Sequence, residues 1–89
     1  MKAIVTVVGK DRVGIIAGVC TKLAQYNINV LDISQTVLQG YFTMSMVTDI
    51  SEATLPLADF AQEMEKAGME FGMSVRIQRA DIFDAMHRI

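Results

Sequence analysis

The sequence predicts an α+β fold, with a four-stranded antiparallel sheet and two main helices packed on one of its faces. Four segments have the apolar or alternating character of strands, and two longer segments repeat their apolar residues with a helical period. Glycine, asparagine or proline stands at the joints between these segments. A chain of 89 residues, 52% of them apolar, is long enough for one domain with its own core.

The first strand and helix are predicted from the opening third of the chain. Residues 3–8 are β-branched and almost continuously apolar, which is typical of a central strand covered on both faces. Residues 9–14 form a loop with two glycines and three charged residues. Asp11 is placed to cap the helix that begins near Val13, and Asn27 can end it in the left-handed conformation. The apolar stripe of this helix consists of Ile15, Ile16, Val19, Cys20 and Leu23.

The middle of the chain predicts a β-hairpin. Residues 28–38 and 41–48 have the composition of strands, and Gln39 and Gly40 between them favour a tight turn. In the second of these strands the apolar residues alternate with polar ones, so one face is apolar: Phe42, Met44 and Met46.

The last third predicts a second helix and a fourth strand. Pro56 is expected in the first turn of the helix, where its missing N–H is not needed, and Gly68 or Gly72 ends the helix. Its apolar stripe consists of Leu57, Phe60, Ala61, Met64 and Ala67. Residues 73–78 alternate as a strand with Met73, Val75 and Ile77 inward. The order β-α-β-β-α-β with right-handed crossovers is that of the ferredoxin-like sandwich.

Residues 80–89 lie outside this domain, which spans residues 1–79. Their apolar residues predict an amphipathic C-terminal helix that packs on the sheet or on a partner subunit: Ile82, Phe83, Met86 and Ile89. In the first strand, Ile4 and Val8 are left on the sheet face opposite the helices. Because a small domain with apolar residues on its second sheet face needs a cover, we expect a homodimer or a larger assembly.

Composition and charge exclude several classes of protein. Eight basic and ten acidic residues, with no block of like charges, argue against a nucleic-acid partner. The single cysteine, Cys20, excludes an intramolecular disulfide framework and is expected in the core as a reduced thiol. No apolar run is long enough to cross a membrane and no signal peptide is recognisable, so we expect a cytoplasmic protein without a membrane partner.

The start of the first helix and the start of the second strand hold residues suited to a small ligand. The N–H groups around Val13, Gly14 and Ile15 can receive a carboxylate. Gly14 lets a ligand approach the backbone without a Cβ in the way. Asp11 could pair with an α-ammonium group, and Asn29 offers both a donor and an acceptor. The same sequence also fits a purely structural interpretation, with Asp11 as an ordinary helix cap and Gly14 as a close-packing glycine.

The element order, with Val-Val-Gly-Lys-Asp-Arg-Val-Gly-Ile at residues 7–15 and Asn-Ile-Asn-Val at residues 27–30, resembles the ACT domain. The resemblance covers residues 2–78 and is strongest to the small stand-alone ACT proteins of bacteria and archaea. Three further stretches are similar to that subgroup: residues 32–37, 41–44 and 82–86. The chain departs from the wider family in lacking the proline of Asp-x-Pro-Gly and in having Asn27 where glycine is frequent.

This resemblance implies a non-catalytic regulatory protein that binds a small metabolite, most of all an amino acid, across a subunit interface. It implies self-association and a regulated partner protein that the sequence does not identify. Two alternatives remain: an acylphosphatase-like hydrolase, which Arg12 and Asn29 match only loosely, and a pure dimerisation module with an empty site. No catalytic residue, cofactor or metal is expected, because the sequence has no second histidine, no phosphate loop and no cluster of metal ligands.

Overall fold

The computed structural model describes residues 1–10 and 14–80 of the chain. Asp11, Arg12, Val13 and the expected C-terminal helix therefore lie outside the described residues. The elements are β1 (Lys2–Lys10), α1 (Ile15–Gln25), β2 (Asn29–Leu38), β3 (Tyr41–Asp49), α2 (Leu57–Glu70) and β4 (Met73–Arg79). The predicted order β-α-β-β-α-β is confirmed, and so is the ferredoxin-like fold.

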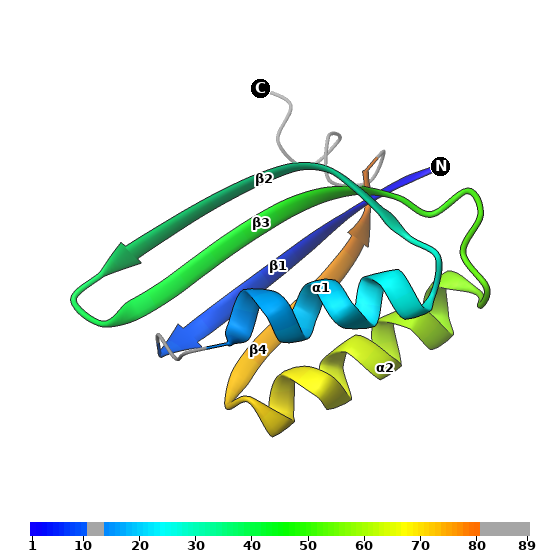
Figure 1. Cartoon of the computed structure of the whole chain (residues 1–89). Helices are drawn as coiled ribbons and strands as arrows, with labels where there is room; N and C mark the ends of the chain where they lie inside the picture. The colour runs from blue at the N-terminus through cyan, green and yellow to red at the C-terminus, as the bar shows by residue number, and fades with distance from the viewer. Residues whose placement is uncertain (11–13, 81–89) are drawn as a thin grey trace.

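The strands form one antiparallel sheet in the order β2-β3-β1-β4. Both helices lie on the same face of this sheet (Figure 1). β1 is central, as predicted, and within the described residues the helices cover only one of its faces. Ala3, Val5 and Val7 are fully buried under the helices, whereas Val8, on the opposite face, is 42% exposed.

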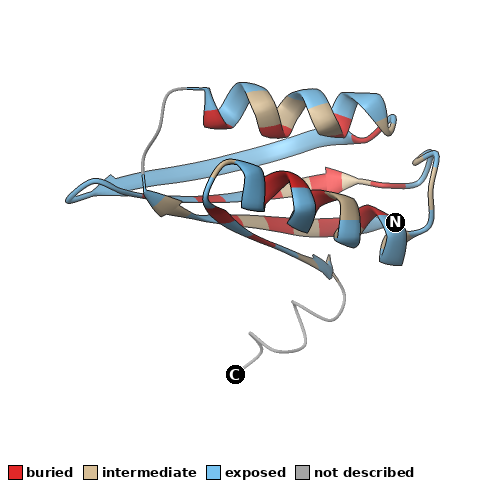
Figure 2. Cartoon of the chain, turned by 90° about the horizontal axis from the view of Figure 1, so that it is seen from below, coloured by how far each residue is buried: buried red, intermediate tan, exposed pale blue. Residues whose placement is uncertain are grey.

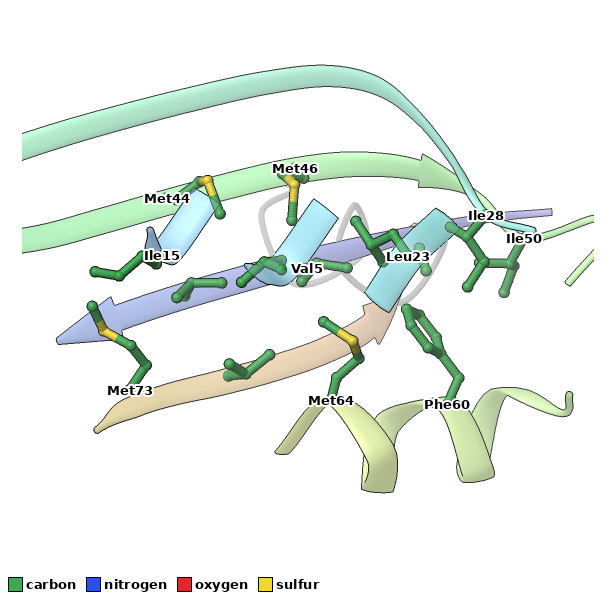
Figure 3. Close-up of a cluster of buried hydrophobic side chains, with 14 of the residues drawn as sticks. Val5, Ile15, Leu23, Ile28, Met44, Met46, Ile50, Phe60, Met64 and Met73 are labelled. Atoms are coloured by element: carbon green, nitrogen blue, oxygen red, sulfur yellow. The ribbon is translucent and has the colours of Figure 1, made fainter. Parts of the chain in front are cut away.

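The core lies between the sheet and the helices (Figure 3). Successive side chains of a strand point to opposite faces, so the predicted inward row of β3 is buried: Phe42, Met44 and Met46. Phe60 and Met64 of α2 complete the core from the helix side. The buried Thr48 fits among them because its hydroxyl donates a 2.9 Å hydrogen bond to the carbonyl of Ala3.

The apolar stripe of α1 is narrower than the sequence predicts. Ile15, Val19 and Leu23 are buried, but Ile16 is 38% exposed and Cys20 is only partly buried. A Cβ built on Gly18 would lie 2.5 Å from the Phe71 ring, so this side of α1 faces the end of α2. Ile16 and Cys20 are each two positions from Gly18 and therefore lie on the opposite flank. The prediction that Cys20 belongs to the core is wrong for this reason.

The turns and helix ends follow the predicted turn chemistry, with one correction. Asn27 (φ 58°), Gln39 (φ 52°) and Gly40 (φ 81°) have the positive φ expected after α1 and in the hairpin. Pro56 stands one residue before α2, as its N-cap, and not in its first turn. Gly72 (φ 70°) follows the end of α2, which confirms one of the two glycines predicted to end this helix.

Candidate functional site

The start of α1 is formed by a glycine in the left-handed conformation. Gly14, the N-cap residue, has φ 86° and ψ 2°, and no side-chain hydrogen bond caps the helix at this residue. Among the described residues, no atom lies within 4 Å of a Cβ built on Gly14, so the interpretation of Gly14 as a glycine packed closely between helix and sheet is wrong. Glycine is favoured here because other L-residues adopt positive φ at a cost.

Ile15 follows at the first position of the helix. Its side chain is 2% exposed and belongs to the core. Only the backbone of Ile15 is therefore available to a ligand. The first N–H groups of an α-helix have no acceptor within the helix and lie at the positive end of its dipole. The start of α1 can accordingly bind an anionic group through backbone atoms alone.

Asn29 stands at the first position of β2, opposite Asp49 in the register of β3. It is exposed and borders an open, polar pocket of about 530 Å³. The pocket lies between the end of α1, the start of β2 and the β3–α2 connection, and is lined by Ala24, Asn27, Ile28, Asn29, Asp49, Ser51 and Glu52. The Asn27 side-chain amide donates to the carbonyl of Glu52 at 3.1 Å and thereby ties the β3–α2 connection to the end of α1.

The pocket carries negative charge on its rim. The pKa of Asp49 is lowered, first by a side-chain hydrogen bond from Ser51 and then by the backbone N–H of Ser51, which donates to Oδ1 at 2.9 Å. The N-terminal ammonium of Met1, 3.9 Å from Oδ1, lowers it further. Asp49 is therefore ionised at neutral pH and suited to attract an ammonium group.

Sequence reasoning missed this set of polar groups around Asn29. A signal for it exists in the residues Asp49-Ile50-Ser51. An aspartate whose carboxylate accepts the N–H two residues later forms an Asx turn, which is typical of the point where a strand ends.

The start of α1 and Asn29 lie at opposite ends of the molecule. α1 has 11 residues and is therefore about 16 Å long, with Gly14 before its first turn and Asn29 after its last (Figure 1). β1 delivers the chain to α1 at Lys10, which pairs with Tyr41, whereas Asn29 pairs with Asp49 at the other end of β3. A single chain does not bring the described candidates Gly14, Ile15 and Asn29 together.

β2 lies at one edge of the sheet, and no other described element covers either of its faces. All ten of its residues are exposed, as the continuous pale blue of this strand in Figure 2 shows. Ile33 and Val37 pair with Met46 and Phe42 and so point to the helix side, yet they are 44% and 54% exposed because the helices do not extend over β2. Asp32 is exposed on this strand and pairs with Val47, so its side chain lies on the sheet face opposite the helices.

Residues 1–10 and 14–80 contain neither a membrane-spanning helix nor a metal-binding cluster. No helix there is long and apolar enough to cross a membrane. In the same ranges, no three histidine, cysteine, aspartate or glutamate side chains gather as they would around a metal ion.

Comparisons with known proteins give consistent results. A family model described as "ACT domain" matches residues 2–78. A UPF0237 protein of Listeria innocua is 49% identical over the whole length of both chains. The structure of an ACT domain protein from Streptococcus pneumoniae superposes with a TM-score of 0.83 at 47% identity, covering 98% of each chain. A formyltetrahydrofolate deformylase from Pseudomonas syringae superposes with a TM-score of 0.80 at 27% identity, over 88% of this chain and 27% of the enzyme.

Proposed function

Because the chain belongs to the ACT domain family, we propose that it is a non-catalytic regulatory protein that binds a free amino acid between two copies of itself. The observation that carries this proposal is the separation of Gly14 and Asn29 at opposite ends of α1. A site that uses both residues requires a second chain. The open β2 edge offers the surface on which that chain can pair.

Antiparallel pairing of two β2 strands about a twofold axis would bring the separated ends together. Leu38, the last residue of β2, pairs with Tyr41, and Tyr41 also pairs with Lys10 at the end of β1. The end of β2 therefore lies at the same end of the sheet as the start of α1. In an antiparallel pair, the start of one strand runs beside the end of the other. Asn29 of the second copy would therefore approach the start of α1 in the first copy.

The two ends are chemically complementary to the two charges of an amino acid. The backbone N–H groups after Gly14 suit the α-carboxylate. The Asn29 end contributes an amide and the ionised carboxylate of Asp49, which suit the α-ammonium. Asp11, which lies outside the described residues, is a second candidate for the ammonium.

The comparisons support a regulatory role for the fold. The matching part of the Pseudomonas syringae enzyme is about a quarter of that chain, as expected of a module that is added to other activities. The proposal includes a cytoplasmic location, with which the lone thiol of Cys20 is compatible. The proposal also includes a regulated partner protein that responds to the ligand-bound state.

The alternative of an acylphosphatase-like hydrolase is disfavoured by the same geometry. Such an enzyme would need Arg12, two residues before Gly14, close to Asn29. Asn29 stands at the far end of α1 from Gly14, so within one chain the described start of this helix and Asn29 do not form one site. An assay with an acyl phosphate separates the two functions, because turnover supports the hydrolase and its absence leaves the sensor.

The direct test is a thermal-shift screen of the twenty standard amino acids, followed by calorimetric titration. A ligand that binds only the native state stabilises it by RT ln(1 + [L]/Kd), or about 2.7 kcal/mol at 100 times Kd. We expect one chemical class of amino acid to raise Tm, and its α-amide and N-acetyl analogues to fail. If no amino acid raises Tm at millimolar concentration, the sensor proposal is wrong and the dimerisation module remains.

A further inference from the structure

The sheet face opposite the helices contains a hollow. Its volume is about 170 Å³, and its lining comes from the three strands β1, β2 and β3: Ile4, Asp32, Ile33, Ser34, Ser45, Met46 and Val47. Ile4 and Val47 pair directly across β1 and β3, so their side chains lie next to each other on this face. Within the described residues, no helix covers them, since α1 and α2 both pack on the other face (Figure 1).

The hollow has the size and chemistry of a pocket for one aromatic side chain. An apolar cavity of about 150 Å³ is large enough to hold a benzene ring. Ile4 and Val47 are each only partly buried, so an apolar group placed between them would remove further apolar surface from water. This gain is independent of the ligand site at the two ends of α1.

The chain leaves the sheet beside this hollow. β4 ends at Arg79, and its residue Gln78 pairs with Ile4. Neighbouring strands are about 4.8 Å apart, so the line from Gln78 across Ile4 to Val47 is about 10 Å long. Four residues of extended chain span about 13 Å, which lets Phe83 reach the hollow from Arg79.

The sequence that follows β4 complements the open face. Residues 81–89 contain the apolar positions Ile82, Phe83, Met86 and Ile89 and the acidic residues Asp81 and Asp84. On the sheet, Lys2 and Arg76 have the strand parity of Ile4 and therefore lie on its face. Asp32 and Asp49 pair onto the same face, so its charges balance and the complementarity lies in the apolar side chains of the segment.

We propose that residues 81–89 fold back over the open sheet face of their own chain and place the Phe83 side chain in the hollow between Ile4 and Val47. The segment then covers the apolar surface that a second copy would otherwise have to cover. Self-association is left to the β2 edge, which keeps the ends of α1 accessible.

Fluorescence of the full-length chain tests the proposal, because the sequence contains no tryptophan. In Phe83→Trp we expect a blue-shifted emission and a several-fold smaller acrylamide quenching constant than in the matched variant Asp84→Trp. Met86→Trp provides a second reporter on the apolar side of the segment. Circular dichroism establishes that each variant retains the native fold.

A second substitution locates the docking site. Val47→Thr, in the Phe83→Trp background, adds a hydroxyl to the wall of the hollow and should shift the emission to the red. Val37→Thr makes the same chemical change on the other side of the sheet and should leave the emission unchanged. If Phe83→Trp has the same quenching constant as Asp84→Trp, the docking proposal is wrong. If the emission of Phe83→Trp does not respond to Val47→Thr, the segment does not dock in this hollow.

Dilution distinguishes whether the hollow is filled by residues of the same chain or by a second copy of the protein. Docking within one chain predicts an emission that stays blue-shifted from high micromolar to nanomolar protein. An emission that shifts to the red on dilution, together with a fall in particle mass, would show that a second copy fills the hollow and would overturn the proposal.

Discussion

The backbone N–H of Ser51 donates a 2.9 Å hydrogen bond to Oδ1 of Asp49, and the Met1 ammonium donates to the Ser51 hydroxyl. Together these groups hold the end of β3, the following turn and the N-terminus in one polar cluster. The cluster stands beside Asn29 and holds the Asp49 carboxylate at the rim of the pocket.

The Asp49 cluster predicts a pH dependence of stability. Its hydrogen bonds lower the pKa of Asp49 below 3.8 in the folded state, so the unfolded state binds the proton more tightly. The contribution of Asp49 to stability is therefore present above about pH 4 and is lost as the pH falls through the folded pKa. NMR titration should show a raised Asp49 pKa in Ser51→Ala, whereas Ser74→Ala serves as a control. An unchanged Asp49 pKa in Ser51→Ala would contradict the assigned hydrogen bond.

Gly14→Ala should destabilise the protein through the backbone. The new Cβ meets no atom of the described residues within 4 Å, but φ at this position is 86°, which costs about 1–2 kcal/mol for an ordinary L-residue. Asparagine tolerates this conformation better, so Gly14→Asn should lose less stability. Urea denaturation measures both. Equal losses in the two variants would point to a cause other than the backbone conformation.

Gly68→Ala should be destabilising although it improves helix propensity. The added Cβ would lie 2.5 Å from Cγ2 of Val75 and 3.0 Å from the carbonyl oxygen of Met73, so α2 and β4 must move apart. Overpacking of this kind costs about 1–3 kcal/mol. Gly18→Ala is the matched control, because its near neighbour is the outer end of the partly exposed Phe71 ring. If Gly68→Ala is as stable as Gly18→Ala, the close contact between α2 and β4 does not make the added methyl group destabilising.

Val37→Lys should weaken self-association through β2. Val37 is 54% exposed on the helix side of this edge, where a lysine would place a charge against the apolar start of the partner's β2 strand. We expect light scattering to give a lower mass than for the wild type. Ser74→Lys on β4 is the control and should leave the mass unchanged. A Val37→Lys protein with the wild-type mass would place the interface elsewhere.

The ligand site should depend on residues from two different chains. Asn29→Ala removes a hydrogen bond worth about 0.5–1.5 kcal/mol, or about 2–12-fold in affinity for the amino acid found in the screen. Asp11→Asn and Asp49→Asn should each weaken an amino acid more than its des-amino analogue if that carboxylate binds the ammonium. Gln35→Ala, also on β2, is the control.

Mixing two defective variants distinguishes a shared site from a site within one chain. If Asp11 and Asn29 belong to one site across two chains, a mixed dimer of Asp11→Asn and Asn29→Ala regains one site with both wild-type residues. Calorimetry should then detect a fraction of sites with wild-type affinity. Failure of the mixture to recover any such sites would contradict the shared site.

Local features of the sequence were sufficient to predict most of the fold. The alternation of Phe42, Met44 and Met46 identifies the buried face of β3, since strand side chains alternate regardless of what packs against them. The turn at Gln39 and Gly40 and the helix end at Asn27 depend on the φ values that these residue types accept. Such features involve a few neighbouring residues, so they can be read from one chain.

The sequence by itself determined the elements, the turns and the family to which the protein belongs. Only the tertiary structure decided which flank of α1 is buried, and it left Cys20 partly exposed because that flank points away from α2. It also decided that Gly14 and Asn29, fifteen positions apart, stand at opposite ends of α1, and that Asp49 lies beside Asn29 on the neighbouring strand. The physical reason is that helix direction and strand order, which no local pattern contains, set the distance between residues of different elements.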